Sequence, residues 1–362
     1  MSAKDQTTGA DTPVLTVVIP SYNVEAYLEH GLSTFADERF GGRLQVLVID
    51  DGSQDATPAI AQRFVERMPD VFTLVSKENG GHGSAINVGL AHATGTYFRV
   101  VDGDDWVDTD ALAAFLDVLD GTDADILIDV RIDVDMATGH EKPRPHGEGV
   151  PLGSVVAFED ICENPVAADS ISIHTLTART ALLREVGLNV LEKTFYEDYE
   201  YISKATLFAR SIEFVDLAVY HYLLGNASQS VADAVFARRW DDHTRVTYEM
   251  LRCYEQVQAS LSEPRRNYLQ RKVNLVIDTH YNIALIFDPE RKRGLARAKE
   301  FRAYLKAKYP EFAQYGEKRY KTAKILHHLR NRLRLISRRF VRSMQLKQTH
   351  DITLSNILND GN

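Results

Sequence analysis

The stretch Phe98-Arg-Val-Val-Asp102-Gly-Asp104-Asp105-Trp106 changes character abruptly, because an apolar β-branched run stops at three carboxylates within four residues. The run from Tyr97 to Val101 is typical of a buried strand, and Asp and Gly are poor strand formers, so we expect the strand to end near Asp102. In an open parallel α/β sheet, ligands bind outside the carboxyl ends of the strands. The stretch therefore predicts acidic groups at a ligand-binding edge.

Two interpretations of these carboxylates are open. Asp102 and Asp104, with a glycine between them, can direct two hard oxygen ligands at one divalent cation and leave positions for water and phosphate oxygens, as magnesium prefers. The alternative is a solvated acidic turn in which Asp105 or Asp108 caps the helix that is expected to begin near Thr109. A motif this short matches by chance, so the rest of the chain has to decide.

The first part of the chain alternates between buried-strand and helical patterns. Apolar runs of strand length occupy residues 14–19, 44–49, 71–75 and 97–101, and helical patterns occupy 25–35, 57–68, 84–93 and 109–119. This alternation predicts right-handed βαβ units, and hence an α/β fold with a mainly parallel sheet. Further strands are expected at 124–130 and 214–220, and a surface loop or hairpin tip at 138–153.

Polar or glycine-rich residues follow each of the first three strands. Tyr22 could pack on a helix or, beside Asn23, stack on a base, and Asp51 could accept a hydrogen bond from a base or a ribose. The glycines at 80, 81 and 83 allow close backbone approach, and a helix that begins there would favour an anion. The phosphate-loop motif and the dinucleotide fingerprint are both missing after the first strand. A cation at Asp102 and Asp104 is therefore needed to balance phosphate charge.

Charge is distributed unevenly along the 362 residues, whose formal net charge is −9. Residues 318–350 contain eleven Lys or Arg and no Asp or Glu, and with Asp351 and Asp360 the segment 318–362 carries +9, which leaves −9 − 9 = −18 on residues 1–317. An acidic body disfavours nucleic acid as a partner. Apolar residues recur every three or four positions in 318–350, which predicts a basic amphipathic helix on an anionic membrane surface; the alternative is a helix docked on the preceding ones.

These patterns predict a division of the chain and a location. We expect a disordered N-terminus at 1–13, an α/β domain at 14–232, a helical domain at 233–317, the basic amphipathic helix at 318–350 and a tail at 351–362. No secretory signal or apolar span of about 18 residues is present, so a cytoplasmic protein is expected, peripheral on the inner face of the cell membrane if the basic helix binds there. Cys162 and Cys253 match no metal or redox spacing and are expected to be packing residues.

Taken in order, the motifs resemble those of family 2 glycosyltransferases with the GT-A fold, a group that includes bacterial capsular and exopolysaccharide sugar transferases. The resemblance covers roughly residues 14–230. The matching elements are Val18-Ile-Pro-Ser-Tyr-Asn23, Val48-Ile-Asp-Asp-Gly-Ser53 with Asp55, Asn79-Gly-Gly81 with Ala85, Asn87 and Gly89, Asp102-Gly-Asp-Asp105, and Glu197-Asp198. Each element alone is weak, but their combination in this order is specific.

The resemblance implies a GT-A nucleotide-diphospho-sugar transferase fold with a C-terminal helical region, and transfer of a sugar from a nucleoside diphosphate donor with inversion. It implies that the donor nucleotide is bound by Pro20, Tyr22, Asn23, Asp51, Asn79, Gly80 and Asp102. Asp102 and Asp104 would hold Mg²⁺ or Mn²⁺, with His221 as a third metal ligand. Asp198 falls at the position of the general base. Contacts to the acceptor or donor sugar are expected from Trp106, Glu197, Ser228, Gln229 and Ser230.

Family prevalence favours a UDP-sugar as the donor, and the acceptor would be a glycan or a lipid-linked hydroxyl in cell-surface polysaccharide synthesis. A second hypothesis is a non-catalytic nucleotide-sugar-binding or scaffold protein of a polysaccharide assembly complex. It is disfavoured because the carboxylates that the chemistry needs are all present. A nucleotidyltransferase would need a glycine-rich basic loop after the first strand, and that loop is missing.

Overall fold

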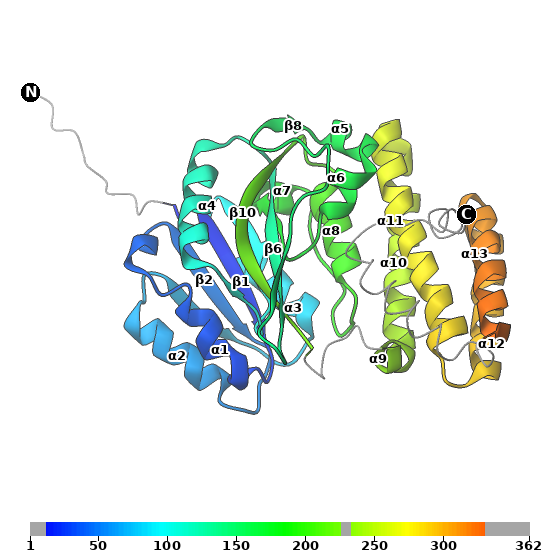
Figure 1. Cartoon of the computed structure of the whole chain (residues 1–362), viewed down its shortest axis with the longest axis horizontal. Coiled ribbons are helices and arrows are strands. Elements are labelled where there is room, and N and C mark those ends of the chain that lie inside the picture. Colours follow the sequence, from blue (N-terminus) through cyan, green and yellow to red (C-terminus); the bar gives the residue numbers. More distant parts are fainter. Residues whose placement is uncertain (1–11, 226–232, 330–362) are drawn as a thin grey trace, which may run out of the picture.

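The computed structural model describes residues 12–225 and 233–329. These residues form a sheet flanked by helices, followed by a group of helices that packs against one side of it (Figure 1). The sheet has ten strands in the order β3-β2-β1-β4-β9-β6-β10-β5, with β7 paired to β6 and β8 paired to β10. The fold class expected from the sequence is therefore confirmed, with a sheet that is mixed rather than mainly parallel.

The first four strands are parallel, as predicted. They are β1 (Leu15–Ser21), β2 (Leu44–Asp50), β3 (Phe72–Ser76) and β4 (Tyr97–Val100), connected by helices α1 (Glu25–Ser33), α2 (Thr57–Arg67) and α3 (His82–His92). β1 is buried along its whole length because helices cover both faces of the sheet. Leu15 is in register with both Leu44 and Tyr97, so β1, β2 and β4 end at a common edge.

The second half of the sheet is mixed. β9 (Leu176–Arg179) runs antiparallel between β4 and β6 (Ile126–Asp135), and β10 (Ser211–Leu224) runs parallel to β6. β5 (Trp106–Val107) and β8 (Val155–Ala157) pair antiparallel with β10, and β7 (Glu141–Arg144) forms a hairpin with β6 inside the expected surface loop. Helix α7 (Thr180–Glu185) follows β9 directly.

Four further helices complete the described α/β part. α4 (Thr109–Gly121) follows β5, and α5 (Phe158–Glu163) and α6 (Pro165–Ser170) follow β8. α8 (Asp198–Thr206) precedes β10 and begins at one of the predicted site residues. One turn of 3₁₀ helix, η1 (Glu38–Phe40), lies between α1 and β2.

The C-terminal part is helical, as expected. It contains α9 (Asp233–Arg238), α10 (Trp240–Val257), η2 (Gln258–Ser260), α11 (Glu263–Asn282), the π-helical turn η3 (Ile283–Phe287), α12 (Arg291–Lys308) and α13 (Pro310–Leu329). None of the helices in the described ranges combines the length and the apolar character needed to cross a membrane.

The helix that was expected to begin at Lys318 begins earlier, at Pro310, as part of α13. Tyr320, Ala323 and His327 are buried in this helix, so its described turns pack on the other helices. The docked alternative is therefore correct for residues 318–329. The remaining positions of the predicted basic helix, 330–350, and the tail 351–362 lie outside the described residues.

The sheet and the helical part share one hydrophobic core. A single cluster of buried side chains extends from Val18 and Phe98 in the sheet to Phe301 and Tyr320 in the last helices. Cations of α11 reinforce this contact: Arg265 donates to the carbonyl oxygens of Leu207 and Ala209, Arg271 to that of Cys162, and Lys272 to that of Ala168. The shift in composition near residue 232 therefore marks a change in secondary structure within one packed body.

The basic segment leads to a first prediction, which concerns anionic lipid. Seven of its eleven cations lie in residues 330–350, beyond the packed turns of α13. We expect the full chain to co-sediment with phosphatidylserine-containing vesicles at low salt and a variant ending at Leu329 to remain in the supernatant, because each cation near an anionic surface contributes about 1 kcal/mol. Neutral phosphatidylcholine vesicles are the control. Equal pelleting of both proteins would contradict a membrane role for this segment.

Candidate active site

The loop after β4 is built around a glycine and a buried carboxylate. A Cβ at Gly103 would lie 2.8 Å from the Pro20 carbonyl oxygen, so a side chain would push β1 and this loop apart. Asp105 is 3% exposed and accepts hydrogen bonds from the Tyr220 hydroxyl at 2.5 Å and the Leu223 amide at 2.8 Å. Burial raises the pKa of Asp105 well above its usual range. Asp105 therefore anchors this loop to β10.

The cap of α4 is Asp108, whose side chain accepts from the Ala111 amide at 2.7 Å. The alternative in which Asp105 caps this helix is wrong, because both of its carboxylate oxygens are directed at β10. Asp102 and Asp104 are both half-buried, and they are the carboxylates of this loop that remain partly open to solvent.

Two histidines flank the carboxylate of Asp102, one at each oxygen. The Nε2 atom of His82 lies 3.0 Å from Oδ1, and the Nε2 atom of His174 lies 3.7 Å from Oδ2. Burial, together with the charge of Arg131, lowers the pKa of His174 to about 3, and its Nδ1 atom lies 3.2 Å from an Arg131 nitrogen. A guanidinium only donates, so Nδ1 accepts, and neutral His174 carries its proton on Nε2, facing Asp102.

The donor set of this loop fits a divalent cation. Ligand atoms of Asp102, Asp105 and His174 lie within 4.8 Å of one another, and Asp104 adds a further half-buried carboxylate on the same loop. Hard carboxylate oxygens suit Mg²⁺ or Mn²⁺. Since the oxygens of Asp105 are engaged by β10 and the Nε2 atom of His174 carries a proton, Asp102 and Asp104 are the residues best able to hold such an ion.

His221 lies elsewhere. Its buried ring stacks on Trp106 at 5.5 Å, and its Nδ1 atom has no hydrogen-bond partner among the described residues. Neighbouring side chains on a strand point to opposite faces, so His221 points away from the face on which Tyr220 contacts Asp105. The predicted role of His221 as a third metal ligand is not supported by this placement. The histidine that lies beside Asp102 is His174. Nothing in the spacing of His174 along the sequence predicts that it lies there.

After β2, Asp51 is 3% exposed and binds the glycine-rich loop. Its carboxylate accepts from Lys77 Nζ at 2.6 Å and from the amides of Gly80 at 2.8 Å and Gly81 at 2.7 Å. The Asn79 side chain donates to the Asp51 carbonyl oxygen at 3.0 Å. Asp51, Asn79 and Gly80 therefore lie together, and Asp51 fixes the shape of the glycine-rich loop.

The loops after β1 and β2 are tied to one another and present an aromatic ring to solvent. Asn23, whose φ is 53°, accepts from the Gln54 amide at 2.8 Å, and Asp50 orients its own loop by accepting from the Ser53 amide at 3.0 Å. Pro20 is buried within β1. Tyr22 is 49% exposed, so its ring is free to stack on a base, one of the two roles expected for it.

The pair Glu197 and Asp198 stands at the start of α8. Glu197 is buried, and its Oε1 atom lies 2.6 Å from Nδ1 of His82. One carboxylate oxygen of Asp198 is buried without a hydrogen-bond partner among the described residues, and burial together with the nearby charge of Glu197 raises the pKa of Asp198 to about 7. His82 therefore joins the loop of Asp102 to the turn of Asp198. Ser228, Gln229 and Ser230 lie outside the described residues.

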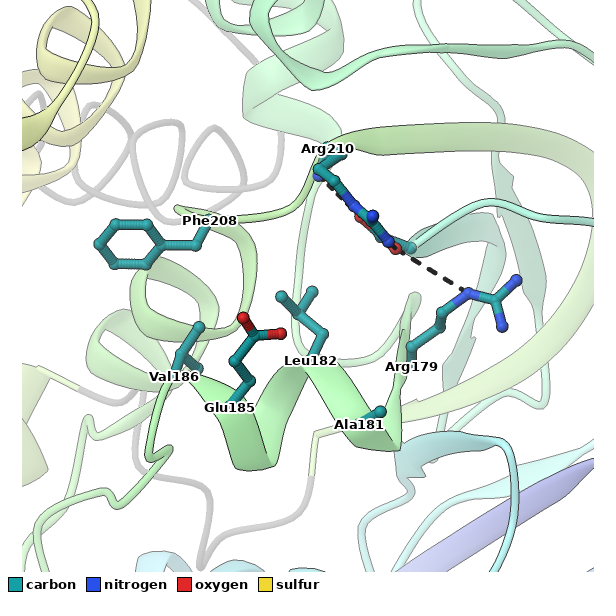
Figure 2. Close-up of a pocket in the computed structure, with 8 residues that line it drawn as sticks. Arg179, Ala181, Leu182, Glu185, Val186, Phe208 and Arg210 are labelled. Atoms are coloured by element: carbon teal, nitrogen blue, oxygen red, sulfur yellow. Dashed lines mark hydrogen bonds and ion pairs between the residues drawn. The ribbon is translucent and has the colours of Figure 1, made fainter.

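A separate pocket lies at the opposite edge of the sheet (Figure 2). Its lining includes Arg179, Leu182, Phe208 and Arg210, and the two arginines form ion pairs with Asp125. Arg179 pairs with Tyr97 at the start of β4, whereas Asp102 follows the end of that strand. The pocket is therefore distinct from the edge where the predicted site residues gather.

Comparisons with known proteins agree with this geometry. Residues 16–186 match the sequence model described as Glycosyl transferase family 2. The chain is 33% identical over 114 residues to the glycosyltransferase GlyA of Streptococcus pneumoniae serotype 4 (strain ATCC BAA-334 / TIGR4), covering 32% of this chain and 16% of that protein. It is 26% identical over 224 residues to the poly(ribitol-phosphate) β-N-acetylglucosaminyltransferase TarS of Staphylococcus aureus (strain Mu50 / ATCC 700699), covering 60% of this chain and 37% of TarS.

The fold is also similar to a solved structure. The crystal structure of S. aureus TarS 1-349 in complex with UDP-GlcNAc superposes with a TM-score of 0.59 at 20% identity, covering 87% of this chain and 91% of that one. The chain thus spans well under half the length of the two full-length relatives named above, but nearly all of the TarS fragment. From the motif order, the sheet and these matches, we conclude that residues 16–186 belong to a family 2 glycosyltransferase domain with a GT-A-like fold, similar to bacterial polysaccharide biosynthesis enzymes.

Proposed function

We propose that the protein is an inverting, cation-dependent glycosyltransferase that moves a sugar from a nucleoside diphosphate donor to a hydroxyl of a glycan or lipid-linked acceptor in cell-surface polysaccharide synthesis. A UDP-sugar is the favoured donor, because the similar TarS fragment was solved with UDP-GlcNAc. The name of TarS, a poly(ribitol-phosphate) β-N-acetylglucosaminyltransferase, favours a cell-surface polymer as the acceptor.

One observation carries this proposal: a desolvated carboxylate with a free oxygen, Asp198, stands beside a strand end that bears two half-buried carboxylates, Asp102 and Asp104. A general base works best when its pKa lies near the working pH, and the pKa of Asp198 is about 7. A binding protein has no need of a carboxylate whose ionisation is this costly.

The residues divide the chemistry between two sides of the site. A cation bound by Asp102 and Asp104 would stabilise the negative charge that develops on the leaving diphosphate. On the other side, Asp198 would accept the proton of the acceptor hydroxyl as its oxygen attacks the anomeric carbon. A single displacement inverts the configuration and needs one base. Tyr22 would stack on the nucleobase of the donor, and the loop shaped by Asp51 would surround its nucleoside.

The test is a screen of the purified full chain against a panel of nucleotide sugars, with Mg²⁺, with Mn²⁺ and with EDTA. We expect one donor to raise the melting temperature only when a cation is present, and to release its nucleoside diphosphate slowly in the absence of an acceptor. The anomeric configuration of the product, determined by NMR, tests inversion. A non-catalytic scaffold would instead bind a donor without consuming it over every acceptor offered.

A further inference from the structure

The side chain of His82 hydrogen-bonds both halves of the proposed site. Its Nε2 atom is 3.0 Å from Asp102 Oδ1, and its Nδ1 atom is 2.6 Å from Glu197 Oε1. Both partners are carboxylates, and an ionised carboxylate only accepts, so both ring nitrogens donate. Charge-assisted hydrogen bonds of this kind are roughly twice as strong as neutral ones. A single imidazole therefore joins the cation side to the turn that carries the base.

The first turn of α3, which carries His82, is held in place by close contacts. His82 is the first residue of α3, and that end of the helix packs closely on residues 190–194: a Cβ at Gly81 would lie 3.2 Å from the Lys193 amide nitrogen. Asn87, one turn further along, exchanges two hydrogen bonds of 3.0 Å with the backbone of Val190. The ring of His82 is thus fixed with respect to the chain that leads into α8.

The turn that His82 reaches is conformationally costly. Tyr196, immediately before Glu197, has φ = 73°, which bulky residues rarely adopt and which persists only when the surroundings impose it. Contacts on both sides help to hold it: the Tyr196 ring stacks on Phe236 at 4.9 Å, and Glu197 bonds His82. Removing the second contact would leave Asp198, the next residue, less well placed.

We infer that His82 is a positioning residue of the proposed transferase, which holds Glu197 and thereby sets Asp198 at a fixed place relative to Asp102. This inference rests on the proposed function and adds a residue to it. His82 acts through Glu197 and does not itself take the proton of the acceptor. The hydrogen bond to Glu197 places Asp198 for proton transfer. The hydrogen bond to Asp102 connects this turn to the loop proposed to bind the cation and the donor.

Two substitutions separate the two bonds. The amide nitrogen of Asn occupies the place of Nδ1, so His82→Asn keeps the bond to Glu197, whereas the amide nitrogen of Gln occupies the place of Nε2, so His82→Gln keeps the bond to Asp102. We expect His82→Gln to lower kcat between about 10- and 100-fold at a nearly unchanged donor KM, because a small misplacement of a catalytic group has this cost. His82→Asn should keep kcat within about threefold.

Hydrogen exchange provides a readout that is independent of turnover. The Tyr201 amide donates to the Glu197 carbonyl oxygen at 2.8 Å in the first turn of α8, so amides of residues 197–201 should exchange faster in His82→Gln than in the wild type or in His82→Asn. His92→Asn is the matched control, since His92 is exposed at the other end of α3 and its ring lies 2.9 Å from the Val88 carbonyl oxygen of the same helix. His82→Gln and His82→Asn should both fold, because Glu200 of α8 still accepts a hydrogen bond from the Leu191 amide at 2.9 Å.

The outcomes separate the inference from the proposed function. If the wild type consumes no sugar nucleotide in the panel, the proposed function is wrong, and the exchange comparison still decides whether His82 holds this turn. If the wild type is active and His82→Gln keeps both its kcat and its exchange rates, the inference is wrong. A rise in donor KM at constant kcat in both variants would also overturn it, because it would make His82 a donor contact.

Discussion

Asp198→Asn is expected to lower the rate of sugar transfer between about 100- and 10,000-fold, the usual contribution of a general base, with donor binding retained. Asn has nearly the same shape as Asp but cannot accept a proton. The wild type should show an acid limb in its pH profile, with activity falling as the pH drops below about 7, since only ionised Asp198 can act as the base. The measurement is kcat against pH with the donor that the screen identifies.

The same substitution should stabilise the fold. The pKa of Asp198 is about 7 in the folded protein, against an ordinary value of 3.8, so the folded state holds its proton more tightly than the unfolded state does. The stability that this provides is present at low pH and is lost as the pH rises from about 4 to about 7. Above pH 7, Asp198→Asn removes a buried charge and should raise Tm by ~2 °C or more.

Asp110→Asn is a suitable control for both effects, because Asp110 lies in the first turn of α4 with a side chain that is 87% exposed. It should leave activity and Tm unchanged. Transfer at the wild-type rate by Asp198→Asn would rule out Asp198 as the base. A drop in its Tm at pH 8 would mean that a further interaction in the folded protein stabilises the ionised Asp198 carboxylate.

Asp104→Ala is expected to abolish cation-dependent donor binding in a protein that still folds. The carboxylate is half-buried on the loop that follows β4 and bears Asp102, so the substitution removes one of the two proposed oxygen ligands of the cation. Titration calorimetry with UDP, in Mn²⁺ and in EDTA, gives the measurement. The wild type should bind more tightly in Mn²⁺, and the variant should bind equally weakly in both.

Asp105→Ala is the matched comparison, one residue further along the loop. It leaves the Tyr220 hydroxyl and the Leu223 amide without their buried acceptor, which costs about 1–3 kcal/mol for each, so the main effect should be a lower Tm. The main effect of Asp104→Ala should therefore be on cation-dependent UDP binding, and that of Asp105→Ala on Tm. Tight Mn²⁺-dependent binding of UDP by Asp104→Ala would remove Asp104 from the cation site.

Much of this site could be predicted from the sequence, because its residues follow strands. The apolar runs that end at Ser21, Asp50 and Val100 fix both the strands and the edge at which their polar ends meet. That parallel register brings Asp51, after β2, to the glycine loop after β3, and it places Asp102, after β4, at the same edge with β1 between the two strands. The pairing of Glu197 with Asp198 was recognised by resemblance, since no local pattern marks a catalytic base.

The histidines could not be predicted in the same way. His174 reaches Asp102 because β9 inserts antiparallel between β4 and β6, and antiparallel insertion depends on long-range pairing that a local pattern does not encode. His82 lies within the glycine-rich motif, and the glycines alone were enough to explain that motif as a loop before a helix. No role for His82 was therefore predicted. His221 was expected as a third metal ligand through the resemblance alone, and in the structure its ring stacks on Trp106 within β10.

The core shared by the sheet and the helices has a consequence for how the protein unfolds. Side chains from Val18 to Tyr320 belong to one buried cluster, and Arg265, Arg271 and Lys272 satisfy carbonyl groups across the contact. Neither part can therefore lose its structure without exposing apolar surface of the other. Calorimetry of the full chain should show a single cooperative transition. The turn that carries Asp198 would then unfold only together with the helical part.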